Sequence, residues 1–268
     1  MTININRDKC VGCGLCVNDC PAHILALEED KAVQKSKGCI FCGHCVAVCP
    51  VQAASSLLPA LNRAPNKELA AEALPDNMAD LVYRLMCERR SIRQFNGAPV
   101  PETVMERLLE VARLSPSAGN RQPLRYILVE EHLAALREGA MEALKAFVQQ
   151  PEEHPYRHFF KVMLAEYEAG RDPLFWQAPQ LLLLVRPKDR DVNDAPIAAG
   201  RIELLAHAEG YGACFIGFIT AILAENVSLR ELVGLKPDEV AQCALILGEP
   251  AVRYHREVAR RPLRLTRL

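Results

Sequence analysis

The chain has 268 residues, half of them hydrophobic, and a formal net charge of −1. This length allows one large or two modest domains of an ordinary globular protein, and the balanced charge excludes a general affinity for nucleic acid or an anionic membrane. The opening residues, MTININRDKC, lack the basic segment and apolar run of a secretory signal. We therefore expect a cytoplasmic protein with neither nucleic acid nor a membrane as partner.

Cysteine is the most unevenly distributed residue type. Eight of the eleven cysteines lie between Cys10 and Cys49. A disulfide framework is typical of small secreted proteins, whereas clustered cysteines without a secretory signal favour metal ligation in a reducing compartment. The N-terminal part of the chain is therefore expected to bind metal.

These cysteines form two copies of one motif, C-x2-C-x2-C-x3-C-P, at residues 10–21 and 39–50. Three cysteines on a tight loop can hold three corners of a [4Fe–4S] cluster, and the fourth, before proline, ligates the other cluster. We therefore expect two [4Fe–4S] clusters. The ligands of the first are Cys10, Cys13, Cys16 and Cys49, and those of the second are Cys39, Cys42, Cys45 and Cys20.

Two other cysteine sites fit this pattern less well. A zinc ribbon leaves the third and fourth cysteines of each run unexplained, and c-type haem attachment needs a histidine directly after C-x-x-C. The pattern resembles bacterial-type 2[4Fe–4S] ferredoxins over residues 1–55. That resemblance implies short strands near residues 3–5, 24–27 and 32–34, in a domain stabilised largely by its clusters.

Residues 56–80 contain three prolines among polar residues and alanines, which indicates a linker before a helix near residues 79–88. The segment E-R-R-S-I-R-Q-F (88–95) follows; it is either a solvated basic face or a phosphate site. Helical spacing of apolar residues predicts a helix from Pro101, and the loop S-P-S-A-G-N-R-Q-P (115–123) precedes a strand at 126–130. The aliphatic run 181–185 indicates a buried strand.

Four segments, taken in order, resemble the nitroreductase family of FMN enzymes over residues 88–268. They are the arginine segment, the 115–123 loop, D-A-P-I-A-A-G-R-I-E-L-L-A-H-A-E-G-Y-G-A-C-F-I-G-F (194–218) and the basic tail L-G-E-P-A-V-R-Y-H-R-E-V-A-R-R-P (247–262). The resemblance implies an α+β domain at 81–268 with a mostly antiparallel sheet flanked by helices, and a homodimer with FMN at its interface. It also implies a helix capped by Asp194 and ended by Gly210.

The same resemblance implies which residues contact FMN. Arg89, Arg90 and Ser91 correspond to the segment that holds the phosphate, and Arg93 to a position near the ribityl chain and the pyrimidine edge of the ring. The loop that touches the ring comprises Pro116, Ser117, Ala118, Asn120 and Gln122. The backbone N–H groups that face N5 and O4 of the ring are those of Ile216 and Gly217. A second phosphate clamp consists of Arg260 and Arg261.

Substrate recognition is less defined by these motifs. Leu124 and Glu249 stand where the family often has aromatic residues, which changes the expected shape of the substrate pocket. Phe160, Tyr167, Phe175 and Trp176 could form a lid that stacks on a planar substrate, or could simply pack between helices. Three cysteines outside the motifs are expected to be buried apolar thiols: Cys87, Cys214 and Cys243.

The combination of cluster motifs and a flavin-binding domain in one chain suggests the direction of electron flow. No G-x-G-x-x-G segment follows a predicted strand, so a Rossmann site for NAD(P)H is not supported. We expect an external low-potential donor, such as a ferredoxin-like protein or a redox enzyme, to feed the clusters. These would reduce FMN, which would reduce a nitroaromatic, a quinone or an activated alkene without a catalytic side chain. The alternatives are an NAD(P)H-dependent nitroreductase whose clusters export electrons to a protein partner, and a non-enzymatic redox module.

Overall fold

The structure is a computed structural model that describes residues 3–57, 75–150, 154–256 and 258–268. The chain divides into two compact units. The first comprises Met1–Leu74 together with the short segment Ala118–Arg121, and the second comprises Pro75–Ser117 and Gln122–Leu268.

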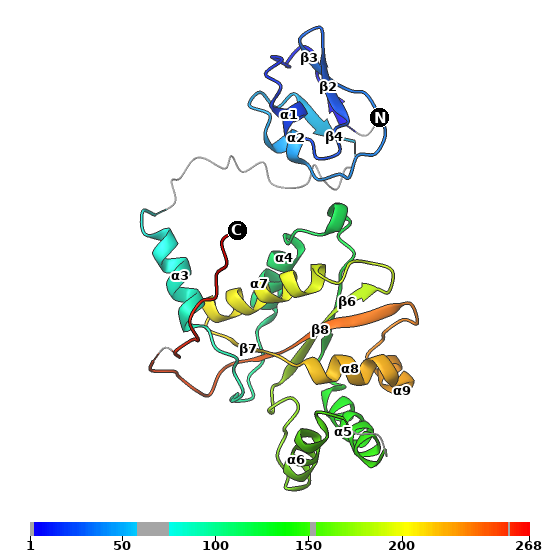
Figure 1. Ribbon diagram of the computed structural model, residues 1–268, viewed down its shortest axis with the longest axis vertical. Coiled ribbons are helices and arrows are strands. Elements are labelled where there is room, and N and C mark those ends of the chain that lie inside the picture. The colour runs from blue at the N-terminus through cyan, green and yellow to red at the C-terminus, as the bar shows by residue number, and fades with distance from the viewer. Residues whose placement is uncertain (1–2, 58–74, 151–153, 257) are drawn as a thin grey trace. The chain divides into compact units, whose positions relative to one another are not determined.

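Over residues 3–57, the first unit contains two small antiparallel sheets and two single-turn helices (Figure 1). Strand β1 pairs with β4, and β2 pairs with β3. Their bounds, with those of the helices, are β1 (Ile3–Ile5), α1 (Leu15–Asn18), β2 (Leu25–Glu28), β3 (Lys31–Gln34), α2 (His44–Ala47) and β4 (Ala54–Ser56). The predicted strands are therefore found, two of them with bounds shifted by one residue.

The internal repeat of the sequence is also a repeat of local structure. Helix α1 begins directly after Gly14 and α2 directly after Gly43, and both glycines have the left-handed backbone that favours this residue, with φ of 75° and 76°. Gly12 is required for a further reason, because a Cβ there would lie 2.2 Å from the Asp30 carbonyl oxygen. Each motif thereby places its third cysteine, Cys16 or Cys45, inside a helical turn.

The second unit is built on a four-stranded antiparallel sheet with the order β5-β6-β8-β7. The strands are β5 (Arg125–Val129), β6 (Gln180–Pro187), β7 (Gly212–Phe215) and β8 (Glu239–Gly248). In the central strand β6, Leu181 and Leu183 face one apolar core, whereas Leu182 and Leu184 face another. This alternation explains the continuous aliphatic run, because both faces of the strand are covered.

Helices cover both faces of this sheet (Figure 1). Helices α4 and α7 pack on one face, and α5, α6, α8 and α9 contribute to the core on the other. The helices are α3 (Met78–Glu88), α4 (Glu102–Arg113), α5 (Leu133–Gln149), α6 (Arg157–Glu168), α7 (Asp194–Ala208), α8 (Gly217–Glu225) and α9 (Val227–Leu232). The predicted α+β class with a mostly antiparallel sheet is confirmed.

Element ends differ from the predictions by small amounts. The residue that caps α7 is Asn193, so Asp194 is the first helical residue rather than the cap. Gly210 follows the end of that helix with φ of 86°, as expected for a glycine that ends a helix. Helix α3 starts at Met78, inside the segment predicted as a linker, and residues 58–74 of that segment lie outside the described residues. Across the described ranges, no helix is both long and apolar enough to cross a membrane.

Two glycines of the second unit give a matched pair for testing its packing. A Cβ on Gly212 in β7 would lie 2.8 Å from Ile92 Cγ2, whereas one on Gly200 in α7 would meet nothing within 4 Å. Gly212→Ala is therefore expected to destabilise the unit by about 1–3 kcal/mol through overpacking, and Gly200→Ala to be neutral or stabilising by up to about 1 kcal/mol. Chemical denaturation followed by circular dichroism measures both; equal effects would contradict this account of the β7 edge.

Candidate cluster and flavin sites

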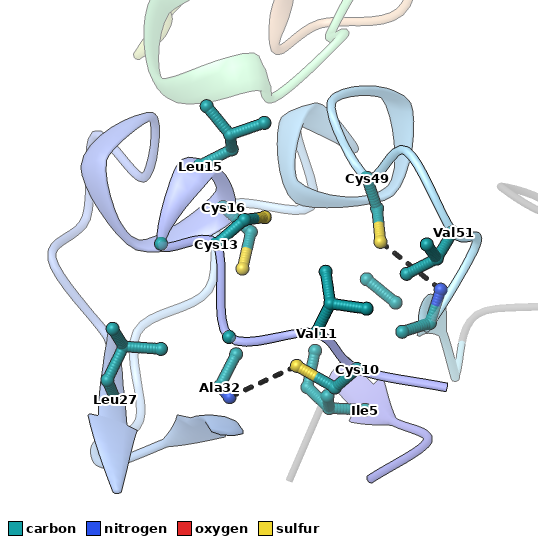
Figure 2. A pocket seen from close by; sticks show the side chains of 14 residues that line it. Ile5, Cys10, Val11, Cys13, Leu15, Cys16, Leu27, Ala32, Cys49 and Val51 are labelled. Atoms are coloured by element: carbon teal, nitrogen blue, oxygen red, sulfur yellow. Dashed lines mark hydrogen bonds between the residues drawn. The ribbon is translucent and has the colours of Figure 1, made fainter. Parts of the chain in front are cut away.

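Two cavities in the first unit are each lined by four motif cysteines. The first is lined by Cys10, Cys13 and Cys16 from one motif and Cys49 from the other (Figure 2). The second has the reciprocal set, which is Cys39, Cys42, Cys45 and Cys20. The structure thus brings together the same two groups of four, crossed between the motifs, that the sequence predicts.

Main-chain N–H groups point at several of these sulfurs. Ala32 N lies 3.4 Å from Cys10 Sγ, and Ala53 N lies 3.2 Å from Cys49 Sγ (Figure 2). In the other motif, Phe41 N lies 3.4 Å from Cys39 Sγ. The N–H groups of Ala32 and Gly12 hold the pKa of the Cys10 thiol below its usual value of 9.0. Such donors favour the thiolate, which is the form that binds metal.

Two further motif cysteines, Cys16 and Cys45, are buried near other motif thiols. Burial, followed by the proximity of Cys42 and Cys39, raises the pKa of Cys45 to about 11. Burial also raises the pKa of Cys16, and among the neighbouring thiols Cys49 contributes most to this rise. Four thiolates that repel one another around a cavity are stabilised by a cationic core, so these residues fit an iron–sulfur cluster. Within the described ranges, no three His, Cys, Asp or Glu side chains are grouped as ligands of a single metal ion.

In the second unit, the predicted phosphate segment is an extended stretch that follows α3. Ser91 forms a parallel bridge with Ala213 of β7, and Ile92 N donates to the Ala213 carbonyl at 3.0 Å. Arg90 Nη1 donates to the Arg89 carbonyl at 2.9 Å, while its Nε is buried without a hydrogen-bond partner among the described residues. A buried, unpaired guanidinium N–H is unfavourable by itself and fits an anionic ligand such as a phosphate.

Arg89 has a partner that the sequence analysis missed. Its Nη1 lies 2.9 Å from Oε1 of Glu203, a buried residue of α7. Burial raises the pKa of Glu203 above its usual 4.5, although Arg89 acts in the opposite direction. Burial likewise lowers the pKa of His207, one turn further along the same helix. The sequence sign of this ion pair was the glutamate among the apolar residues of I-E-L-L-A, because a carboxylate that is buried with such neighbours requires a partner.

The predicted flavin loop has an irregular backbone. Gly119, Asn120 and Gln122 all have positive φ, and Ser117 Oγ accepts the Gln122 N–H at 2.9 Å. Pro116 and Ser117 belong to the second unit with Gln122, whereas Ala118 and Asn120 belong to the first. There, Asn120 Nδ2 donates to the main-chain carbonyls of Ile40 and Phe41 at 3.2 and 2.9 Å, so this amide contacts the second cysteine motif.

One of the two expected backbone donors to the ring is already paired. Ile216 N donates to the Ala244 carbonyl at 2.9 Å, and the residue is buried in the core. The expectation that its N–H faces a flavin is therefore not met, because the hydrogen bonds between β7 and β8 continue past Phe215 to this N–H group. Gly217 is the first residue of α8, where N–H groups have no partner within the helix. Arg260 and Arg261 lie exposed in the C-terminal segment 258–268, which has neither helix nor strand.

The four aromatic residues considered for a lid have different environments. Phe160 and Phe175 are 7% and 0% exposed and belong to the core, which supports the packing alternative for both. Tyr167 is partly buried against the same core. Trp176 is 40% exposed and is the exception. Of the three cysteines outside the motifs, Cys214 is buried, whereas Cys87 and Cys243 are only partly so.

Known protein families match both the cysteine-rich N-terminal part of the chain and the part that follows it. Residues 86–249, more than half of the chain, match the Nitroreductase family. The chain belongs to the nitroreductase family. Residues 2–50 match the 4Fe-4S dicluster domain, so the nitroreductase domain is preceded by an iron–sulfur domain.

Three relatives illustrate the likeness. The chain is 28% identical over 170 residues to a putative NADH dehydrogenase/NAD(P)H nitroreductase of Methanothermobacter thermautotrophicus, covering 61% of this chain and 74% of that protein. It is 31% identical over 172 residues to an NADH dehydrogenase of Thermus thermophilus, covering 61% and 77%. A Bacteroides fragilis nitroreductase structure with bound FMN aligns with a TM-score of 0.55 at 17% identity, covering 69% of this chain and 98% of that one. This nitroreductase is therefore an oxidoreductase with the family's fold.

Proposed function

We propose that this nitroreductase passes electrons from a low-potential donor through two [4Fe–4S] clusters to FMN, and from there to a small organic acceptor. The observation that carries the proposal is the pair of cavities in the first unit, each lined by three cysteines of one motif and one of the other. A nitroreductase domain alone has no need of such sites. Their presence in the same chain supports an electron source other than nicotinamide.

The residues of the second unit fit the phosphate end of FMN. Arg90 offers a buried N–H that has no hydrogen-bond partner in the described part of the chain. Arg89 is held at 2.9 Å by Glu203, which fixes the direction of its guanidinium group. Ser91 adds a hydroxyl on the same extended segment. Bound FMN would supply the two-electron chemistry, and the role of these side chains is to bind and orient it. Gly217, at the start of α8, offers a main-chain donor of the kind that a flavin ring accepts.

The acceptor that fits best is a planar, electron-poor molecule such as a nitroaromatic, a quinone or an activated alkene. The partly exposed Trp176 offers an aromatic surface for stacking, whereas Phe160 and Phe175 are buried and do not. We assign no side chain as a general acid or base. We also propose a homodimer, in keeping with the exposed Leu263, Leu265 and Leu268 of the C-terminal segment, which a second subunit could cover.

The printed names of two relatives favour a second candidate. These proteins are described as an NADH dehydrogenase and as a putative NADH dehydrogenase/NAD(P)H nitroreductase. In that case NAD(P)H would reduce the flavin directly, and the clusters would export electrons to a protein partner.

Turnover of a nitroaromatic with two donors distinguishes these functions. The wild-type chain and the Cys49→Ala variant are supplied anaerobically with either a reduced low-potential ferredoxin or NADPH. The proposal predicts rapid turnover with ferredoxin in the wild type only, and slow turnover with NADPH in both. Rapid NADPH-driven turnover in both proteins, with no turnover from ferredoxin, would contradict it and favour the alternative. FMN content, measured for each sample, serves as the control.

A further inference from the structure

The only tryptophan of the chain faces a residue that we assign to the flavin. The guanidinium carbon of Arg93 lies 5.9 Å from the ring centroid of Trp176. Trp176 is 40% exposed, although it follows Phe175, which is completely buried. A large indole left partly in solvent is not explained by core packing. Its distance to the Arg93 guanidinium is that of a cation–π contact.

The turn that carries Trp176 is held by one buried carboxylate, that of Asp172. Oδ1 accepts the N–H groups of Leu174 and Phe175 at 3.2 and 2.9 Å, and Oδ2 accepts the Gln177 N–H at 2.9 Å. Arg137 Nε lies 2.8 Å from the same Oδ2. These contacts fix the backbone on both sides of Trp176, so the position of its indole ring is restricted.

The backbone of this turn is also strained. Trp176 and Gln177 are consecutive residues with φ of 57° and 58°, a left-handed conformation that is costly for non-glycine residues. Strain of this kind persists where surrounding contacts enforce it, and it is concentrated at functional sites. Here the contacts that enforce it are those of Asp172, and the result is an outward-facing indole.

The backbone around Arg93 is fixed as well. Ile92 N donates to the Ala213 carbonyl at 3.0 Å, and Ala251 N donates to the Gln94 carbonyl at 2.9 Å. The Arg93 side chain is itself exposed and, without the indole, could sample many rotamers. A flat guanidinium stacks on an aromatic face better than the ammonium group of lysine does. The indole therefore restricts the one part of Arg93 that the backbone does not fix.

We infer that Trp176 is a positioning residue that holds the Arg93 guanidinium for the FMN, and thereby favours binding of reduced FMN over oxidised FMN. The inference rests on the proposed function. A fixed cation beside the flavin stabilises the anionic reduced form more than the neutral oxidised form, because only the former carries the extra negative charge. A guanidinium free to move into solvent is screened and stabilises it less.

The test is the ratio of dissociation constants for oxidised and reduced FMN, measured anaerobically by calorimetry on the full chain after removal of flavin. Trp176→Leu is expected to reduce the preference for reduced FMN about fivefold, equal to a fall of about 20 mV in the two-electron potential. Trp176→Phe should retain most of the preference. Arg93→Gln should lose it, and Trp176→Leu should then have no further effect. Phe159→Leu, at another exposed aromatic of the same unit, is the matched control.

An unchanged preference in Trp176→Leu, or an effect that adds fully to that of Arg93→Gln, would overturn the inference. Arg93→Lys tests the same contact without altering the indole, and it remains informative should Trp176→Leu fail to fold. It keeps the charge but loses the flat stacking surface, so we expect a reduced preference, and a wild-type ratio would overturn the inference. Failure of the wild-type chain to bind FMN at all would instead refute the proposed function.

Discussion

Replacing Cys49 by alanine is expected to remove the cluster of the opposite motif, although Cys49 lies more than thirty residues from Cys16 in the sequence. In the structure it lines the cavity of Cys10, Cys13 and Cys16. Iron and acid-labile sulfide should fall by about half, because one of two clusters is lost. The first unit should also lose its cooperative thermal unfolding, since its apolar core is small and the clusters are part of it.

Double variants distinguish crossed from uncrossed ligation. With the crossed arrangement, Cys10→Ala/Cys49→Ala affects one cluster and retains half of the iron, whereas Cys10→Ala/Cys20→Ala affects both. Uncrossed ligation predicts the reverse order. Cys87→Ala, outside both motifs, is the control and should leave the iron content unchanged. Iron and sulfide assays on anaerobically purified protein provide the measurement.

Replacing Arg90 by glutamine is expected to weaken FMN binding by about 10- to 100-fold, the effect of losing a charged hydrogen bond worth about 1.5–3 kcal/mol. The physical reason is the buried Nε, which has no partner among the described residues and which a phosphate oxygen would pair. Riboflavin lacks the phosphate, so its affinity should be the same in the variant and the wild type. Fluorescence titration of each flavin gives both dissociation constants.

The matched control for Arg90 is Arg84→Gln. Arg84 pairs with Glu88 on the exposed surface of α3, and a surface pair of this kind contributes little to stability or binding. It should bind both flavins as the wild type does. An equal loss of FMN and riboflavin in Arg90→Gln would mean that Arg90 supports the fold rather than the phosphate, and an unchanged FMN affinity would remove it from the site.

The local features of the first unit could be predicted from sequence because its chemistry is encoded at fixed spacing. The cysteine repeat alone predicted which four residues would meet in each cavity. The glycines before α1 and α2 agree with that repeat, because the turn preceding each helix needs a left-handed residue. In the second unit, the unbroken aliphatic run of β6 predicted a strand buried on both faces.

Contacts between residues distant in sequence were beyond such reasoning. The pairing of Glu203 with Arg89 depends on how α7 packs beside the arginine segment, and no local pattern encodes it. Ile216 was predicted to offer its N–H to a flavin, but the register of β7 and β8 commits that group to Ala244. Adjacent aromatic residues also differ in solvent exposure. Phe175 is buried and Trp176 is exposed because of the turn that Asp172 holds.

The most direct test of the account is whether electrons placed on the clusters reach the flavin. The anaerobically purified chain, with its clusters and FMN present, is reduced photochemically in the absence of NAD(P)H, and the flavin absorbance is followed with time. We predict that FMN bleaches after cluster reduction and within the time of one turnover. Clusters that become reduced while FMN stays oxidised on that timescale would contradict the account.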